Sequence, residues 1–156
     1  MDFETRLRSE HPDELKLWLR LLTCTQLIER KLGQSLRAQF NTNLARFDLM
    51  AQLERTPKGL AMKQLARQLM VTGGNVTGLT DQLQKDGLVT REKLDPDRRS
   101  IRVMLTPKGR AEFARMAKAH EDWVVSAFGH WNPTEQRTLY ELLGRLKKAN
   151  SLPESL

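Results

Sequence analysis

The fold is decided by residues 95–109, which read DPDRRSIRVMLTPKG. The sequence DPD at 95–97 is typical of a turn, because proline fixes φ and aspartate hydrogen-bonds its own local backbone. Apolar side chains then alternate along 101–105, which predicts a short strand with one covered face. Thr106 and Pro107 follow as an N-cap and a first helical residue. The stretch therefore predicts a basic hairpin tip, a strand and the start of a helix.

The size and charge of the chain suit one compact subunit with a polyanionic partner. It has 156 residues, and 26 Lys and Arg against 19 Asp and Glu give a formal net charge of +7. A chain of this length buries a core, and its basic balance favours nucleic acid, although an anionic membrane surface would satisfy the same charge. No stretch is long and apolar enough to span a bilayer, and the N-terminus is acidic rather than signal-like. We therefore expect a cytoplasmic protein with no membrane partner.

Apolar residues recur at helical spacing on both sides of the hairpin. The first such run predicts one long helix over 13–40, opened by Pro12. A helix of that length spans about 40 Å, more than a domain of this size needs, so part of it should pack on another subunit. Gly87 is the expected C-terminal cap of a central helix, and Asn132 begins a capping box. The further helices are expected over 44–53, 60–69, 72–86, 107–131 and 133–146.

The helix expected over 72–86 has an apolar side and a small, polar side. Val76, Leu79 and Leu83 share the apolar side of the helical wheel. The glycines and threonines are poor helix formers, and such a conflict with the flanking pattern tends to mark a functional surface. Small residues let a backbone approach a groove closely, while Thr and Asn side chains hydrogen-bond phosphates or base edges. The candidate DNA-reading residues here are Thr72, Gly73, Gly74, Asn75, Thr77, Gly78, Asp81 and Lys85.

Alternatives exist for this helix. The glycines could serve close helix packing, with the threonines acting only as caps. Asp81 should be repelled by phosphates unless it accepts from a cytosine amino group or pairs with Arg91 or Arg99, and we favour the pairing. Because Lys85 is the only basic residue on this helix, most of the electrostatic attraction must come from the hairpin and from elsewhere in a dimer.

The central part of the chain, residues 44–110, resembles the MarR family of winged helix-turn-helix transcriptional regulators. The stretch LARQL at 65–69 looks like the first helix of the family's helix-turn-helix, and VTGLTDQL at 76–83 resembles its recognition helix. DGLV at 86–89 leads into residues 97–109, which are similar to the family's wing signature. The flanking helices match the family by pattern only.

The resemblance implies a mainly α fold with a small β wing. The resemblance further implies that residues 1–156 form a single subunit. A winged helix-turn-helix over 44–106 lies between an N-terminal dimerisation helix over 13–40 and C-terminal dimerisation helices over 107–150. The resemblance also implies an obligate homodimer, a roughly palindromic operator in double-stranded DNA, and a small ligand bound between the dimerisation helices and the wing domain. Two recognition helices on one face of a dimer should lie about 34 Å apart, in successive major grooves.

The hairpin supplies the remaining DNA-binding candidates. By the family likeness Arg99 would enter the minor groove, Asp97 would orient it, and Arg98 would contact the backbone or share the groove. Arginine suits a narrow minor groove because its planar guanidinium enters where negative potential is concentrated. A charge run is by itself usually solvated surface, so the assignment depends on the neighbouring helix-turn-helix pattern.

The stretch TGGNVTG at 72–78 resembles, more narrowly, branches of the family that control the breakdown of aromatic acids, including hydroxycinnamates and their coenzyme A thioesters. We therefore expect a repressor that such a compound releases from DNA. Its pocket should be apolar with few polar groups, and two arginines offer charge to a carboxylate or phosphate. Core packing is the alternative for each apolar residue, as it is for the histidine. The effector candidates are Arg20, Arg37, Phe40, Phe47, Met50, Met116 and His120.

Other classes of protein find less support in the sequence. Cys24 would suit a peroxide sensor, but no adjacent cation favours its thiolate, so we expect it to be buried and inert. His11, His120 and His130 lack the spacing of metal ligands. The HExxH, GxSxG and P-loop motifs are missing, so we expect neither an enzyme nor a cofactor. An architectural DNA-binding protein without ligand control is the other alternative.

Overall fold

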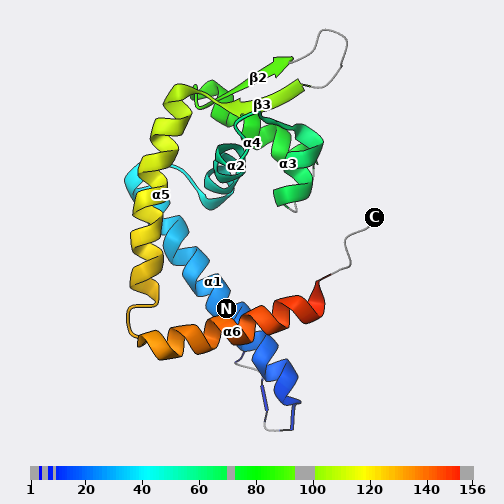
Figure 1. The fold of residues 1–156 in the computed structure, drawn as a ribbon, viewed down its shortest axis with the longest axis vertical. Helices are drawn as coiled ribbons and strands as arrows, with labels where there is room; N and C mark the ends of the chain where they lie inside the picture. The colour runs from blue at the N-terminus through cyan, green and yellow to red at the C-terminus, as the bar shows by residue number, and fades with distance from the viewer. Residues whose placement is uncertain (1–3, 5–6, 9, 70–72, 94–100, 152–156) are drawn as a thin grey trace.

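The computed structural model describes residues 4, 7–8, 10–69, 73–93 and 101–151. Most of these residues are helical, and Figure 1 shows the hairpin strands at one end of the molecule. The mainly α fold with a small β wing that the sequence predicts is confirmed. The elements are, in order, α1 (Asp13–Phe40), α2 (Leu44–Glu54), β1 (Leu60–Ala61), α3 (Met62–Leu69), α4 (Gly73–Lys85), β2 (Val89–Lys93), β3 (Ile101–Leu105), α5 (Pro107–Ala127) and α6 (Pro133–Asn150).

Local hydrogen bonds explain where several of these helices begin and end. Thr106 caps α5, because its side chain accepts from the backbone N–H of Gly109 at 2.9 Å. α6 begins with the expected capping box, in which Asn132 and Glu135 each accept from the other's backbone N–H. α1 ends at Asn41, whose φ of 50° is left-handed, a conformation that asparagine tolerates better than most residues.

The described strands form one antiparallel sheet in the order β1–β3–β2. Val103 of the central strand pairs with Leu60 of β1, and both are buried. The sequence-based expectation of a helix from residue 60 is wrong for its first two residues, which form β1. The reason lies at Gly59, whose positive φ of 77° turns the chain so that Leu60 reaches the free edge of β3.

The core lies in what we call the winged-helix lobe, which comprises α2, α3, α4 and the sheet. Figure 1 shows the three helices of the lobe packed below the strands. Each helix contributes buried leucines, and α1 and α5 add one fully buried side chain each from outside the lobe. The most completely buried of these side chains are Leu36, Leu49, Met50, Leu53, Leu65, Val76, Leu83, Val103 and Met116.

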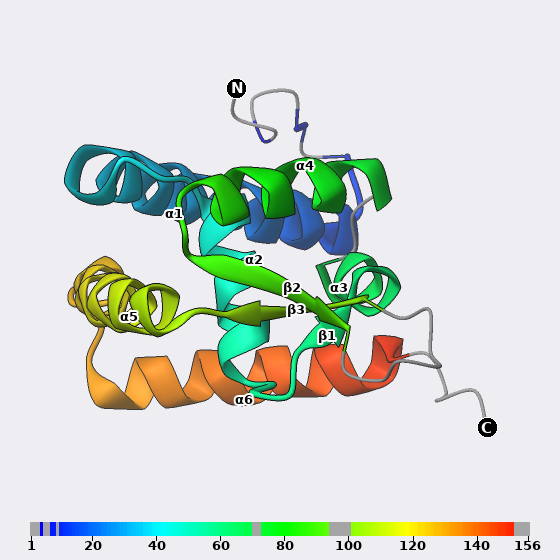
Figure 2. The same ribbon diagram turned by 90° about the horizontal axis from the view of Figure 1, so that it is seen from above.

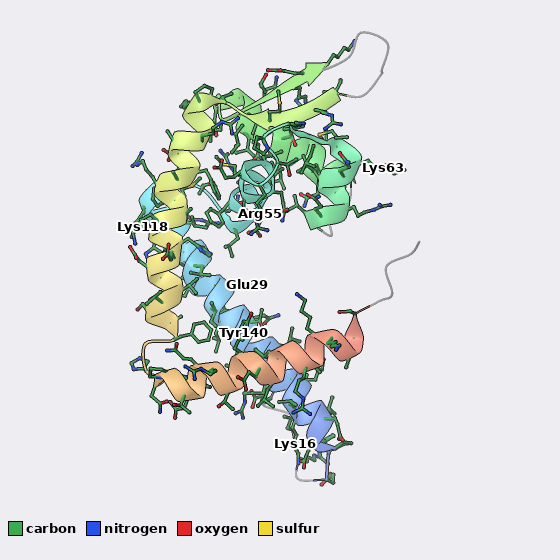
Figure 3. All side chains as sticks on the ribbon, viewed as in Figure 1. Lys16, Glu29, Arg55, Lys63, Lys118 and Tyr140 are labelled. Atoms are coloured by element: carbon green, nitrogen blue, oxygen red, sulfur yellow. The ribbon has the colours of Figure 1, made fainter. Side chains whose placement is uncertain are left out.

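α6 lies outside this core. In Figure 1, α1 and α5 extend away from the lobe toward α6, and Figure 2 shows α1 and α6 on opposite sides of the molecule. No residue of α6 is buried, and Figure 3 labels its Tyr140 far from the crowded interior of the lobe. None of the described helices is long and apolar enough to cross a membrane. The exposed large apolar residues of α1, α5, α6 and the turn before α6 are Leu15, Leu17, Trp18, Leu27, Val125, Trp131, Tyr140, Leu142, Leu143 and Leu146.

Candidate DNA-binding surface

α4 separates its apolar and polar residues as the sequence predicts. Val76 and Leu83 are fully buried in the lobe. Gly73 and Gly74 begin the helix, while Thr72 lies outside the described residues. One face of α4 therefore fixes the helix in the lobe, and the other faces away from it. The predicted reading residues exposed on that second face are Asn75, Thr77, Gly78, Asp81 and Lys85.

Gly78 and Thr80 show why this helix contains weak helix formers. A Cβ added to Gly78 would meet no described atom within 4 Å, so close helix packing does not account for that glycine. Thr80 is buried instead, and its hydroxyl donates to the carbonyl of Val76 at 2.7 Å. Because Gly78 has no side chain, nothing projects from the exposed face of α4 at this position. The backbone can therefore approach a DNA groove closely. Thr80, in contrast, belongs to the core.

Asp81 is paired on this exposed face. Arg91 of β2 donates from Nη2 to Oδ1 of Asp81 at 2.5 Å, and its Nη1 donates to the side chain of Gln84. The arginine side chain is 24% exposed and the aspartate 59%, so the ion pair extends from the sheet to the outer face of α4. This is the pairing that the sequence favours for Asp81, and it reduces the repulsion that the carboxylate offers to a phosphate.

The β2–β3 hairpin follows α4 in the chain. Gly87, with a φ of 73°, ends α4 in the position predicted for its cap and turns the chain into β2. β2 and β3 then pair as far as Lys93 and Ile101. The candidates Asp97, Arg98 and Arg99 belong to the connection between these two strand ends and lie outside the described residues.

Most of the predicted effector residues pack against one another. Phe47, Met50 and Met116 are buried in the core. The ring of His120 stacks on that of Phe47 with centroids 4.7 Å apart. Phe40 lies edge-on to a tryptophan ring of α5 at 6.4 Å. These contacts are those of a packed junction between α1, α2 and α5.

The two predicted effector arginines lie on different parts of α1. Arg20 pairs with Glu4 through Nε and Oε1, which are 2.5 Å apart. Arg37 lines a hollow of about 530 Å³ between α1, the turn that follows it, the start of α2, and α4. Arg30, which the sequence analysis did not select, lines the same hollow about two helical turns earlier, and this spacing on one face is a signal the sequence contains. The hollow is lined by Arg30, Gly33, Gln34, Arg37, Asn43, Leu44, Ala45, Leu79 and Gln82.

A titratable group lies near the junction of α1, α2 and α5. Burial raises the pKa of Asp48 on α2 above its ordinary value, because a less hydrated carboxylate is less stable. The positive potential of His120 opposes this rise, and the negative charge of Glu29 adds to it. The ionisation of Asp48 is thus coupled to side chains on both long helices.

Cys24 is exposed on α1, so the expectation of a buried cysteine is wrong. The buried residues of α1 are Leu32 and Leu36, both in the C-terminal half that packs on the lobe. Cys24 lies before them, where α1 extends beyond the lobe and the core does not cover it. Across the residues that the structure describes, no group of three or more His, Cys, Asp or Glu side chains could hold a metal ion.

Comparison with known proteins agrees with this geometry. The model of the MarR family matches residues 40–100. The HTH-type transcriptional regulator PecS from Dickeya dadantii is 26% identical over 152 residues, which cover 94% of this chain and 92% of that protein. The crystal structure of a MarR family transcriptional regulator from Silicibacter pomeroyi has a TM-score of 0.76 at 29% identity, covering 93% of this chain and 100% of the other.

A further structure shares the fold. Sco3205, a MarR family transcriptional regulator from Streptomyces coelicolor crystallised in complex with DNA, has a TM-score of 0.78 at 24% identity, covering 97% of this chain and 96% of its own. The segment that matches the family model contains every element from α2 to β2. These relatives are transcriptional regulators and not enzymes. The matched segment, the relatives along nearly the whole chain and the shared fold make this protein similar to the MarR family of winged-helix transcriptional regulators.

Proposed function

We propose that this protein is a MarR family regulator, a cytoplasmic, dimeric repressor that binds a roughly palindromic operator and leaves it on binding a small aromatic acid or its coenzyme A thioester. The observation that carries the proposal is the exposed polar face of α4, whose apolar face is buried in the lobe. A helix that exposes small and polar residues fits a major groove, and the N-terminal residues of such a helix contact base edges. In α4 these are the residues around Asn75, Thr77 and Gly78.

A second subunit accounts for the exposed apolar face of α6. Leu142, Leu143 and Leu146 share one side of this helix and are 52%, 37% and 43% exposed. Soluble monomers rarely leave such a patch uncovered, and a two-fold axis would cover it with the same patch of another subunit. Pairing of this kind gives each dimer two copies of α4, which suits an operator with half-sites about 34 Å apart.

We place the effector in the hollow between α1 and α4. The guanidinium groups of Arg30 and Arg37 attract a carboxylate or a phosphate, while Leu44 and Leu79 offer apolar surface to an aromatic ring. A ligand there contacts both a long helix and the reading helix. If it binds one arrangement of these helices more tightly than the other, it shifts the dimer toward that arrangement and lowers its affinity for DNA.

The DNA-binding part is tested by selecting duplexes from a random pool and measuring affinity by fluorescence anisotropy. Asn75→Ala should weaken binding to the selected operator by about tenfold and leave an unrelated duplex unaffected, because it loses a base contact. Lys85→Met should weaken both duplexes and lower the salt dependence by about one counterion. Arg99→Ala should also weaken operator binding. Lys147→Met on α6 is the control, and near-uniform affinity for all duplexes would support an architectural protein instead.

The effector part is tested by thermal-shift screening against aromatic carboxylates, hydroxycinnamates and coenzyme A thioesters, followed by release of the operator. Arg30→Gln and Arg37→Gln should each abolish the thermal shift and the release, because each removes a charge from the hollow. Lys31→Gln removes a neighbouring charge on α1 outside the hollow and should respond as the wild type does. A full response from both arginine variants would show that the effector binds elsewhere.

The exposure of Cys24 favours one competing mode of control, oxidation of this thiol by peroxide. Cys24→Ser separates the two modes, because it should leave DNA binding and effector release intact. If peroxide releases the wild type from DNA and Cys24→Ser abolishes that release, redox sensing becomes the better assignment.

A further inference from the structure

The C-terminal end of α4 is joined directly to the start of α5. We call the two segments that meet there, Asp86–Leu88 and Thr106–Gly109, the cap junction. The hydroxyl of Thr106 donates to the carbonyl of Gly87 at 2.7 Å. The backbone N–H of Thr106 donates to the carbonyl of Leu88 at 3.0 Å. Since Thr106 is also the N-cap of α5, a single residue connects the end of the reading helix to the beginning of the next long helix.

Gly109 and Lys108 add to this connection. A Cβ on Gly109 would lie 1.9 Å from the carbonyl oxygen of Leu88, so the two backbones touch with no side chain between them. Lys108 donates from Nζ to the carbonyl of Asp86 at 2.8 Å. The carboxylate of Asp86 is in turn paired with Arg46 of α2, whose side chain is only 14% exposed. A tilt of α5 relative to the lobe therefore strains the end of α4 directly.

Asn75, Thr77 and Gly78, which we propose contact base edges, lie in the N-terminal half of α4, away from the cap junction. α4 has 13 residues, so it is about 20 Å long at about 1.5 Å per residue. A rotation of about 10° at its C-terminal end moves its N-terminal end by about 3.5 Å, which is about one base-pair step of DNA. Small changes at the junction thus produce displacements near Asn75, in the first turn of α4, that base recognition detects.

We propose that Thr106, Lys108 and Gly109 are positioning residues that transmit the tilt of α5 to α4 and thereby set the half-site spacing that the dimer accepts. The inference rests on the proposed function, because spacing has meaning only for a dimer on two half-sites. α5 runs from the cap junction toward α6, so its direction depends on how two subunits pair (Figure 1). The three residues act through α4 and are not themselves assigned to base contacts.

The test measures the affinity of the full-length chain for its selected operator and for versions with one base pair added to or removed from the centre. Lys108→Met removes the donor to Asp86, and Thr106→Asp keeps the N-cap acceptor for Gly109 while losing the hydroxyl donor to Gly87. Both variants should reduce the discrimination between spacings by about fivefold or more, which is the lower end of ordinary coupling between sites. Their affinity for an unrelated duplex should not change.

Two matched variants serve as controls. Arg110→Met removes a cation from the same turn of α5, at an exposed side chain, and Thr106→Ser keeps both hydrogen bonds of the threonine. Both should keep the spacing profile of the wild type. Gly109→Ala must displace Leu88 and should reduce discrimination further. Should that variant fail to fold, the Lys108 and Thr106 variants still decide the matter.

Two results would overturn the inference while leaving the proposed function in place. One is a wild-type spacing profile in both Lys108→Met and Thr106→Asp. The other is an equal loss of discrimination in Arg110→Met, which would attribute the effect to charge and not to the junction. A wild-type protein that selects no operator sequence would overturn the proposed function itself, and this inference with it.

Discussion

The winged-helix lobe buries its leucine side chains, whereas α6 leaves its leucine side chains partly exposed. Leu49, Leu65 and Leu83 of the lobe are 0% exposed, whereas Leu142 of α6 is 52% exposed. Full burial of a leucine stabilises a fold by about 1.5–3 kcal/mol, so the lobe obtains its stability from one chain. α6 has its capping box and its backbone hydrogen bonds but no buried residue. The part that we propose reads DNA and the part that we propose pairs subunits therefore have separate sources of stability.

The largest expected effect is in the lobe. Leu49→Ala should lower the free energy of unfolding by about 3 kcal/mol, because it leaves a cavity at a fully buried site. Urea denaturation at several protein concentrations measures this loss, which should not depend on concentration. Leu142→Ala is the matched variant on α6, and its cost should appear only through the dimer. Equal, concentration-independent losses for the two variants would contradict the separation.

The next effect concerns pairing. Leu142→Glu combined with Leu146→Glu should raise the dissociation constant of the dimer by about a hundredfold, because it places charges in an apolar contact. Sedimentation equilibrium measures the constant, and near-ultraviolet circular dichroism should show an intact lobe. Glu141→Gln on the same helix is the control. A dimer that dissociates no more readily than the wild type would place the interface elsewhere.

A smaller effect is expected at the start of α6. Asn132→Ala removes the acceptor of the capping box and should cost about 1 kcal/mol of helix stability. Because no core holds α6, this loss should reduce its helicity and weaken the dimer, as far-ultraviolet circular dichroism and sedimentation would show. Asn132→Asp keeps an acceptor and should behave as the wild type. A loss confined to the lobe would argue against this account.

The smallest effect concerns pH at the junction of α1, α2 and α5. The pKa of Asp48 is raised in the folded protein, so the folded state keeps this proton in a window where the unfolded chain has lost it. The stability that this group contributes is greatest below that window and falls as pH rises through the folded pKa. Asp48→Asn should remove the fall.

Melting temperatures of the wild type and Asp48→Asn, compared from about pH 4 to about pH 6, test the sign. The wild type should lose stability relative to the variant as pH rises, and by a small amount because solvent reaches the carboxylate. A wild type that gains stability relative to the variant over this range would show that the electrostatic attraction of His120 outweighs burial.

The sequence was sufficient wherever the deciding interactions are local or periodic. The two faces of α4 follow from the spacing of Val76 and Leu83, and the pairing of Asp81 follows from the cost of an unpaired charge beside phosphate. The capping box at Asn132 depends on residues three positions apart. Such features require no knowledge of distant parts of the chain.

The features that the sequence did not predict depend on distant contacts. Leu60 pairs with Val103, which is more than forty residues away in the sequence. The residues near Leu60 do not predict this pairing. The sequence around Cys24 lacks an adjacent cation, which favours a buried and inert thiol, but its exposure depends on where α1 leaves the lobe. The spacing of Arg30 and Arg37 places both on one face of α1, but that face lines a hollow only because the distant α4 packs beside it.

The position of α6 in the chain bears on how the protein is made. Every lobe residue precedes α6, so translation supplies the whole core before the leucines of α6 leave the ribosome. The exposed leucines of α6 are therefore synthesised after the winged-helix lobe, which has had time to begin folding. Two chains with folded lobes associate through α6 and not through unfolded core segments. This order of synthesis lowers the risk of aggregation.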